Sequence, residues 1–366
     1  MKILLLGDAG NYHSSLAHGL KKLGHDVTVA SDTQTAKCDI NLSHGNGRIA
    51  RSLFLARLAT TLADKLKGYD IVQLASPDFI NLPAPNRMAL LQKLKKGNGA
   101  VYITALKPDS AIISNLCGTE PALEYSRWHS PKGLRPWAKN PDAAIDTWLN
   151  PDLQRHTREI YHSVDGVISG RYEYHKVIES VFPDIPLAYG GIPVIAEAYG
   201  KPRTGNFNDR YSFLITSVKN NDDERGLHIF STMLQMAEAH TRSKFRRVMV
   251  PPMHFDDFIA EMRHCEMVCE DIYSHSPGPL ALAAMAIGVV PASGAEEGFY
   301  KFIGEEELRP IFNPVPDHVK VNFKEFAELL ANPDRLTRMS KDGPEFVRRH
   351  NDSEVVAKRF VDFWER

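Results

Sequence analysis

Two turns in the sequence carry residue types that can recognise a phosphate or a sugar. The first is G-D-A-G-N-Y-H-S-S near the N-terminus, where Gly10, Asn11 and His13 precede a helical pattern of apolar residues. Backbone N–H groups at a helix N-terminus attract anions, and polar side chains there can bind a sugar hydroxyl. The alternative is that Ser14 or Ser15 simply caps the helix, and both interpretations can hold together. The turn does not match G-x-G-x-x-G, which argues against a dinucleotide oxidoreductase.

The second turn, S-H-S-P-G-P, gives the sharper signal. It follows a predicted strand that ends near Tyr273, and it begins an alanine-rich helix over residues 279–287. The loop from Ser276 to Gly278 would aim backbone N–H groups at an anion, at the positive end of that helix. A tightly packed core helix would explain the alanines, but it explains the S-P-G-P turn less readily.

Both turns belong to an alternation of strands and helices that runs twice along the chain. The first half predicts strands over residues 3–6, 27–29, 69–75, 100–106 and 165–170, with helices that include residues 49–67 and 86–96. After a Gly/Pro hinge, the second half predicts strands over residues 211–218, 246–252, 267–272 and 289–294. This alternation is typical of parallel sheets, whose ligands bind at the carboxyl ends of the strands. We therefore predict two Rossmann-like domains with a cleft between them.

Composition limits the classes of protein that the chain can belong to. Its 366 residues suggest two domains, and its formal net charge of −1 argues against a protein whose main work is non-specific nucleic-acid binding. The four cysteines are too few for a disulfide framework, and the first apolar run is too short for a signal peptide. No run approaches the roughly 18 apolar residues that span a bilayer. We expect a cytoplasmic protein with no nucleic-acid partner, and peripheral contact with the inner face of a membrane stays open.

The second turn and its helix resemble those of the GT-B glycosyltransferases, in particular family 4 of the retaining enzymes. That family carries E-G-F-G-x-x-x-x-E-A-M-A-x-G-x-P-V in its second domain. Here Ala284, Met285, Ala286 and Gly288 match the A-M-A-x-G core, and Gly278 matches a loop glycine. The resemblance extends over nearly the whole chain, as far as the closing segment R-R-H-N-D-S-E-V-V-A-K-R-F-V-D-F-W-E-R.

The resemblance implies an α/β GT-B fold, with two Rossmann-like domains facing across a cleft. Residues 1–195 would form the acceptor-binding domain, joined by a C-terminal helix over residues 346–366 that crosses back to it. Residues 196–345 would form the domain that binds the nucleotide-sugar donor. The irregular stretch 120–151 would face the acceptor, or its three tryptophans would pin it to the domain surface.

The resemblance also implies a donor site, in which Lys219, Arg225 and Gly278 would bind the diphosphate. The sequence departs from the family pattern at two positions, because the two glutamates of the E-x7-E motif fall on His275 and Ala283. Alanine cannot accept hydrogen bonds from a ribose, which places nucleotide affinity in question. His275 could contact the sugar or a phosphate, or it could only pack in the turn.

Glu296 and Glu297 are candidate replacements that would bind the donor sugar, unless they are simply exposed charges. The catalytic side chains would then be His13, His275 and Glu296, with Gly10, Asn11 and His13 in the acceptor-side loop. GT-B enzymes generally need no bound metal or other cofactor, since cations of the protein stabilise the diphosphate.

The implied function is retaining transfer of a hexose from a nucleotide-diphosphate-sugar donor to a carbohydrate or lipid-linked acceptor. Such a reaction belongs to the synthesis of surface polysaccharide or glycoconjugate. Two alternatives stay open. One is a catalytically silent GT-B scaffold that binds a partner or a glycan, which the missing glutamates favour. The other is a nucleotide-sugar epimerase of the same fold.

Overall fold

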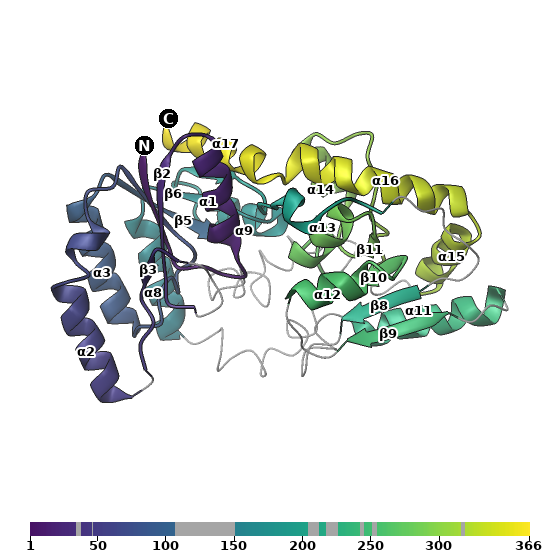
Figure 1. Ribbon diagram of the computed structural model, residues 1–366, viewed down its shortest axis with the longest axis horizontal. Coiled ribbons are helices and arrows are strands. Elements are labelled where there is room, and N and C mark those ends of the chain that lie inside the picture. The colour runs from purple at the N-terminus through teal and green to yellow at the C-terminus, as the bar shows by residue number, and fades with distance from the viewer. Residues whose placement is uncertain are drawn as a thin grey trace. The chain divides into compact units, whose positions relative to one another are not determined.

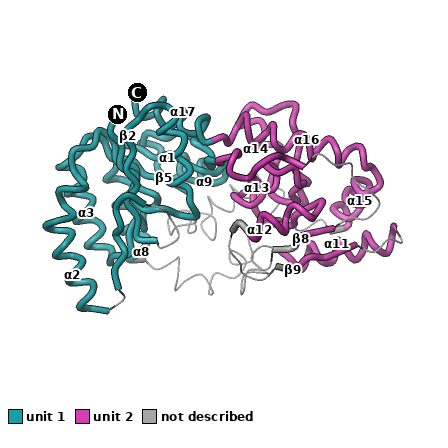
Figure 2. The backbone as a smooth tube through the Cα atoms, in the orientation of Figure 1, with its two compact units in different colours: residues 1–114, 145–193, 353–366 teal, residues 115–144, 194–352 magenta. Residues whose placement is uncertain are grey.

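The computed structural model (Figure 1) describes residues 1–33, 38–45, 47–106, 151–203, 212–216, 226–241, 245–250, 255–315 and 319–366. The chain divides into two compact units, drawn in different colours in Figure 2. Unit 1 comprises Met1–Ser114, Ile145–Pro193 and Ser353–Arg366, and unit 2 comprises Asn115–Ala144 and Val194–Asp352. The sequence divides the chain at residues 195 and 346, and the compact units divide it at Pro193 and Ser353.

Unit 1 contains a parallel sheet of seven strands in the order β3-β2-β1-β4-β5-β6-β7. The strands are β1 (Lys2–Leu6), β2 (Asp26–Ser31), β3 (Ile40–Asn41), β4 (Ile71–Leu74), β5 (Ala100–Ala105), β6 (Gly166–Ser169) and β7 (Leu187–Tyr189). The helices are α1 (Tyr12–Lys22), α2 (Arg48–Ala59), η1 (Asp64–Leu66), α3 (Ala84–Gly97), α8 (Pro151–Ser163), α9 (Tyr172–Val181) and α17 (Ser353–Trp364). The continuous apolar run of β1 is buried, as expected for a parallel strand that is covered on both faces.

The closing helix of the chain packs in unit 1, which confirms the predicted return. A Cβ atom on Gly19 of α1 would lie 2.0 Å from the carbonyl oxygen of Ser353, so only glycine allows α1 and α17 to approach this closely. At the other end of α17, Nε1 of Trp364 donates to Oε1 of buried Gln73, at 3.2 Å. The returning helix starts later than the predicted residue 346. The helix before it, α16 (Pro333–His350), continues to His350, and the chain turns before Ser353.

The predicted helix over residues 49–67 is wrong in its length, because α2 ends at Ala59 and a separate turn, η1, follows. The hydroxyl of Thr60 donates to the carbonyl oxygen of Ala56 at 2.9 Å. Threonine side chains compete in this way with the helical backbone pattern, and β-branching disfavours helix continuation.

Unit 2 contains a parallel sheet of four strands in the order β11-β10-β8-β9. The strands are β8 (Ser212–Thr216), β9 (Arg246–Val250), β10 (Met267–Cys269) and β11 (Val290–Ala292). The helical elements are η2 (Ala196–Tyr199), α11 (Leu227–Thr241), α12 (Phe255–Met262), α13 (Pro279–Ala286), α14 (Glu297–Ile303), α15 (Val319–Leu330) and α16. Successive residues of β8 enter different cores: Phe213 packs in the cluster that contains Phe230 and Phe326, and Leu214 packs in the cluster that contains Ile259 and Ala283. Both faces of this sheet are therefore buried.

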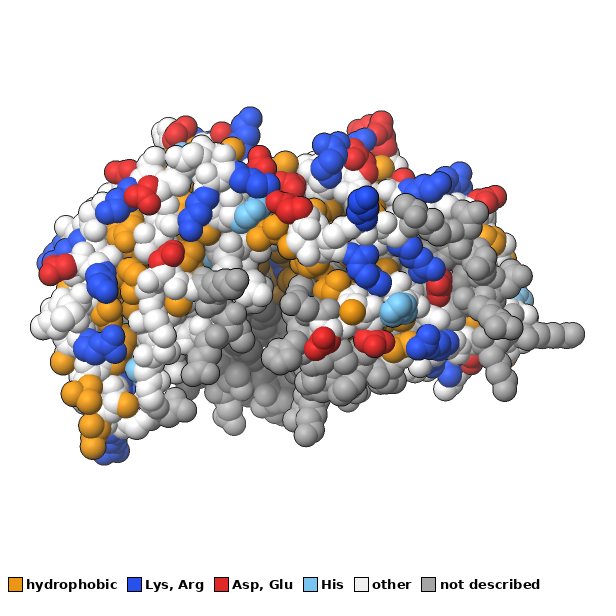
Figure 3. Space-filling view, in the orientation of Figure 1, with side chains coloured by type: hydrophobic (Ala, Val, Ile, Leu, Met, Phe, Trp, Pro, Cys, Tyr) orange, Lys and Arg blue, Asp and Glu red, His pale blue; other side chains and the backbone are white. Residues whose placement is uncertain are grey.

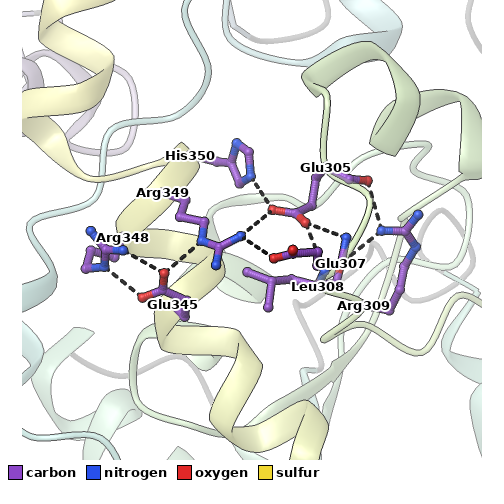
Figure 4. A network of polar contacts seen from close by, with 8 residues as sticks. All are labelled: Glu305, Glu307, Leu308, Arg309, Glu345, Arg348, Arg349 and His350. Carbon is purple, nitrogen blue, oxygen red and sulfur yellow. Dashed lines mark hydrogen bonds and ion pairs between the residues drawn. The ribbon is translucent and has the colours of Figure 1, made fainter.

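A charged network fixes the C-terminal end of α16 within unit 2 (Figure 4). The carboxylate of buried Glu305 lies 2.8 Å from Nε2 of His350 and accepts hydrogen bonds from the backbone N–H groups of Leu308 and Glu307. Burial would raise the pKa of the Glu305 carboxyl, but these hydrogen bonds outweigh burial and the pKa is lowered.

The outer part of the network is more exposed. Glu345 accepts hydrogen bonds from Arg348 and Arg349, which lower the pKa of its carboxyl to about 2. The ion pairs join successive turns of α16 and continue from Arg349 to Glu307 at 3.1 Å (Figure 4).

No helix among the described residues is long and apolar enough to cross a membrane.

Candidate functional site

In unit 2, a buried polar cluster lies where β10 and β11 end. Glu270 and Asp271 directly follow β10, Ser293 directly follows β11, and all three side chains are nearly inaccessible to solvent. The two strands are adjacent and parallel, so their carboxyl ends meet at one edge of the sheet. The hydroxyl of Ser293 donates to Oε2 of Glu270 at 2.7 Å.

The carboxylate of Glu270 also lies against the glycine of the S-P-G-P turn. A Cβ atom on Gly278 would lie 2.6 Å from Oε1 of Glu270, closer than atoms of that kind approach. Gly278 precedes the first residue of α13, and the positive end of a helix stabilises a carboxylate beside it. The carboxylate of Glu270 is therefore an anion of the protein itself that lies beside this turn.

The predicted site residues His275 and Glu296 lie side by side in this cluster. Nδ1 of His275 is 3.2 Å from Oε2 of Glu296, and the backbone N–H of Glu296 donates to the carbonyl oxygen of His275 at 3.1 Å. Both side chains are buried. Glu296 stands immediately before α14, so the helix start fixes its backbone while its side chain turns to the imidazole. The pair can orient a ligand hydroxyl that donates to the carboxylate of Glu296.

Other predicted donor residues have different surroundings. The side chain of Glu297 is 63% exposed and lies 3.7 Å from Arg309. Ala283 is buried in the apolar cluster on the α12–α13 side of the sheet, where a carboxylate would have to be desolvated. Lys219 and Arg225 lie outside the described residues.

In unit 1, the turn between β1 and α1 is built by three residues in the left-handed region. Gly7, Gly10 and Asn11 have φ values of 80°, 60° and 64°. Oδ1 of Asp8 accepts the backbone N–H of His13 at 3.0 Å, and Oδ2 accepts the hydroxyl of Ser14 at 2.6 Å. The side chain that satisfies the first N–H groups of α1 is therefore Asp8, and the expectation that Ser14 or Ser15 caps the helix is wrong. Asp8 precedes the turn, and its side chain reaches across the turn to the first residues of α1.

His13 is fully buried beside this turn. Its Nδ1 lies 2.6 Å from the carbonyl oxygen of Gly7, and a carbonyl can only accept, so Nδ1 carries the hydrogen. Burial lowers the pKa of His13 and outweighs the opposing effects of Asp8 and of the Gly7 carbonyl. The ring is therefore neutral near pH 7, with a lone pair on Nε2. That atom has no hydrogen-bond partner among the residues that the structure describes, so it can accept a proton or a hydrogen bond.

Sequence reasoning missed several buried polar residues at these two edges. In unit 2 these residues are Glu270, Asp271 and Ser293. In unit 1 they are Ser169 and His175, and Oγ of Ser169 lies 2.9 Å from Nδ1 of His175. A signal was available for the first three, because each lies near the carboxyl end of a predicted strand of a parallel sheet, at 267–272 or 289–294. For metal, no group of three or more His, Cys, Asp or Glu side chains that could hold an ion occurs within the described ranges.

No protein-family model matches the sequence, and no curated protein matches it. Solved structures do match. Sucrose-phosphate synthase from Thermosynechococcus elongatus is similar with a TM-score of 0.64 at 12% identity, over 100% of this chain and 98% of the other. An alpha-glucosyltransferase in complex with UDP and a 13-mer DNA is similar with a TM-score of 0.60 at 11% identity, over 100% of both chains. UDP-GlcNAc 2-epimerase from Neisseria meningitidis, bound to UDP-GlcNAc, is similar with a TM-score of 0.54 at 13% identity, over 99% of both chains.

These neighbours are GT-B glycosyltransferases and an epimerase, and each is similar over almost its whole length. The two parallel sheets, of seven and four strands, are the two α/β domains of that architecture. At this level of identity the likeness concerns the fold. The chain has the GT-B fold, as its sequence predicted.

Proposed function

We propose that the chain is a glycosyltransferase that moves a sugar from a nucleotide-diphosphate donor to a carbohydrate or lipid-linked acceptor. The observation that carries the proposal is the buried pair of His275 and Glu296 at the carboxyl ends of β10 and β11, where α/β sheets bind ligands. Neighbours of the same fold, solved with UDP or UDP-GlcNAc, support a nucleotide-sugar donor.

In the proposed donor site, Glu296 accepts hydrogen bonds from hydroxyls of the sugar, and His275 holds its carboxylate in place. A charge-assisted hydrogen bond in a buried site is about twice as strong as a neutral one. Lys219 and Arg225, with the α13 N-terminus at Gly278, would bind the diphosphate and stabilise the negative charge that develops on the leaving group. We leave Glu297 out of the proposed site because its side chain is exposed and lies near Arg309.

In the proposed acceptor site, the turn with Gly10, Asn11 and His13 meets the hydroxyl that attacks. Nε2 of His13 carries a lone pair and can accept a hydrogen bond from that hydroxyl.

We propose, from the A-M-A-x-G resemblance, that the transfer retains the anomeric configuration of the donor and needs no metal or other cofactor. The reaction would belong to the synthesis of surface polysaccharide or glycoconjugate in the cytoplasm. The anomeric coupling constant in the proton NMR spectrum of the product tests the proposed stereochemistry: retention of the donor's anomeric configuration is expected, and inversion would contradict it.

A titration of nucleotides tests the proposal. Thermal unfolding is followed with UDP, GDP and their sugars at millimolar concentration, and release of the nucleotide is then measured with the donor that stabilises most. Binding at 100 times Kd should add about 2.7 kcal/mol to the free energy of unfolding. If no nucleotide stabilises the chain, the proposal fails and a silent scaffold takes its place.

A matched pair of variants locates the donor site. Glu296→Gln removes the buried charge and should lower kcat/KM about tenfold to 100-fold, since a charged hydrogen bond is worth about 1.5–3 kcal/mol. Glu297→Gln makes the same chemical change one residue away, on an exposed side chain, and should leave kcat/KM within about twofold. Equal losses in the two variants would remove Glu296 from the site.

The second candidate function is a nucleotide-sugar epimerase, favoured by the fold likeness to the Neisseria meningitidis enzyme. An epimerase inverts one carbon of the sugar and needs no acceptor. Incubation of the UDP-sugar alone, followed by NMR, distinguishes the two functions. A new epimer without nucleotide release would favour the epimerase, and release that depends on an acceptor would favour the transferase.

A further inference from the structure

The face of unit 1 formed by α2, η1 and α3 is far more cationic than the rest of the chain. Residues 48–67 and 84–97 together contain nine Lys and Arg residues and one acidic residue, Asp64, for a net charge of +8. The whole chain has a net charge of −1. Lys67 is paired with Asp64 at 3.2 Å, and Arg87 and Lys95 are paired with Asp78 and Asp165 of neighbouring segments at 3.0 and 3.1 Å. Lys93 and Lys96 form no ion pair with a carboxylate among the described residues. An excess of this size on two neighbouring helices attracts a polyanion or an anionic surface.

The same face contains an apolar cavity of about 470 Å³. It lies between the three elements, and its apolar lining includes Leu58 and Leu66 from the α2–η1 segment and Leu90 and Leu94 from α3. Lys67, Lys93 and Lys96 line it as well. Aliphatic walls with ammonium groups beside them match the chemistry of a lipid, which has hydrocarbon chains below a phosphate.

Aliphatic side chains also project from the first turns of α2. Ile49 is 79% exposed and Leu53 is 62% exposed. They are four residues apart, so they lie on one side of the helix, and the exposed residues Arg48 and Arg57 belong to the same helix. Figure 3 shows this combination at the lower left of the view, where hydrophobic side chains gather over α2 with Lys and Arg beside them. Large apolar side chains this exposed mark contact surfaces when they occur together.

We propose that the α2–η1–α3 face docks on an anionic phospholipid bilayer. The cations would contact lipid phosphates, and Ile49 and Leu53 would enter the boundary between headgroups and acyl chains. A nucleic acid or a soluble acidic protein would use the cations but would leave the exposed aliphatic side chains and the apolar cavity without a partner. The inference concerns unit 1 alone and does not depend on the catalytic proposal.

Co-sedimentation of the full chain with vesicles tests the proposal. One set of vesicles contains phosphatidylcholine with about 30% phosphatidylglycerol, which gives the surface a negative charge. The other set is pure phosphatidylcholine, and both are measured at about 0.1 M salt. The chain should pellet with the anionic vesicles, and pelleting should weaken as the salt concentration rises. No pelleting with anionic vesicles, or equal pelleting with neutral ones, overturns the proposal.

Charge-reversal variants locate the contact. The double variant Lys93→Glu, Lys96→Glu should lower the partition coefficient at least about tenfold, since each cation near an anionic surface strengthens binding about fivefold. Its matched control is Lys320→Glu, Lys324→Glu on exposed positions of α15 in unit 2, which makes the same change in net charge. Equal losses in the two double variants would show a net-charge effect and would overturn the assignment to this face.

Apolar substitutions separate a bilayer from other polyanions. The double variant Ile49→Ser, Leu53→Ser keeps every charge and should weaken vesicle binding about tenfold or more, because buried aliphatic groups add to electrostatic attraction. Val321→Ser, at a position that is 51% exposed in unit 2, is the control and should leave binding unchanged. Circular dichroism checks that all variants are folded. If the Ile49 and Leu53 variant binds vesicles as the wild type does, docking of these side chains on a bilayer is wrong. Heparin, a soluble polyanion, should compete for the cations and release the wild-type chain from the anionic vesicles at low salt. If heparin releases no protein, the cations do not hold the chain on the vesicles, and docking by this face is wrong.

Discussion

The carboxyl edges of the two sheets differ in how their polar groups are satisfied. In unit 2, the edge is crowded and internally paired, since Glu270 is bonded to Ser293 and Glu296 lies against His275. In unit 1, the turn after β1 is open around Gly10, and buried His13 keeps one ring nitrogen without a partner among the described residues.

The difference teaches which edge must change to bind a ligand. A buried carboxylate that already has a partner gives up that partner or shares it when a ligand arrives, so its contribution to affinity is reduced. A buried nitrogen without a partner gives up no hydrogen bond when a ligand hydroxyl reaches it, although the atoms that cover His13 must first move aside. We infer that the unit 2 edge holds its residues in place for a donor, and that the unit 1 turn provides a group for direct contact.

The largest expected effect comes from adding a methyl group to the crowded edge. The Cβ atom in Gly294→Ala would lie 2.2 Å from the backbone oxygen of Ser274, which cannot move without the turn, and the free energy of unfolding should fall by about 3 kcal/mol. Urea unfolding measures the loss.

The matched variant is Gly10→Ala in the unit 1 turn. A methyl group at Gly10 would meet no described atom within 4 Å, but its φ of 60° is unfavourable for alanine. The expected loss is about 1–2 kcal/mol, from conformation alone. Equal losses at the two glycines would contradict the contrast between a crowded edge and an open one.

A second comparison removes one hydroxyl from each edge. Ser293→Ala leaves the buried carboxylate of Glu270 without its donor and should cost about 1–3 kcal/mol. Ser14→Ala removes the hydroxyl that donates to Asp8, but backbone N–H groups of α1 still donate to that carboxylate, so the cost should stay near 1 kcal/mol or below. Urea unfolding of both variants gives the comparison, and a larger loss at Ser14 would reverse it.

Protonation of His13 provides a third comparison. Its folded-state pKa is lowered from the ordinary value of about 6.5, so the unfolded chain takes up a proton that the folded chain excludes. The contribution of His13 is therefore present above about pH 6.5 and is lost as the pH falls toward the folded-state pKa. The comparison uses about pH 7.5 and about pH 5.5, on either side of the ordinary histidine pKa. Between these two values, Tm should decrease less in His13→Gln than in the wild type. An equal decrease would show that His13 is not held neutral.

The sequence predicted the architecture better than it predicted the contacts of the edges. Apolar runs such as β1 and the Gly/Pro-rich turns give the alternation of strands and helices, which is a local property. The pairing of His275 with Glu296 joins residues 21 positions apart and depends on where α14 begins. The resemblance made both residues candidates for the donor site, but nothing in the sequence predicts that Glu296 is buried and Glu297 exposed.

Two further features show why the remainder was not predictable. Glu270 faces Gly278 because β10 ends where it does, and a short strand end is set by packing in three dimensions. The partner of the first N–H groups of α1 is Asp8, before the turn, because three left-handed residues bring the chain back on itself. Neither relation follows from a local pattern.

The smallest expected effect lies away from both edges, in the network of α16. The pKa of Glu345 is lowered to about 2 by its arginine partners, so its contribution to stability is present above its ordinary pKa of 4.5 and is lost as the pH falls toward 2. Its side chain is 34% exposed, and solvent screening should limit the contribution to below about 1 kcal/mol. Glu345→Gln should therefore lower Tm slightly at pH 6 and hardly at all near pH 2. A large loss at both pH values would indicate a packing role.

Hydrogen–deuterium exchange with and without saturating UDP tests the central claim, that the unit 2 edge is the donor site. Exchange should slow in the segments that contain Glu270, His275 and Glu296, with no comparable change in α15, which the proposed donor site does not include. Protection of those segments, lost in Glu296→Gln and kept in Glu297→Gln, is the predicted result. Binding of UDP without protection at the ends of β10 and β11, or no binding of any nucleotide at millimolar concentration, would contradict the account.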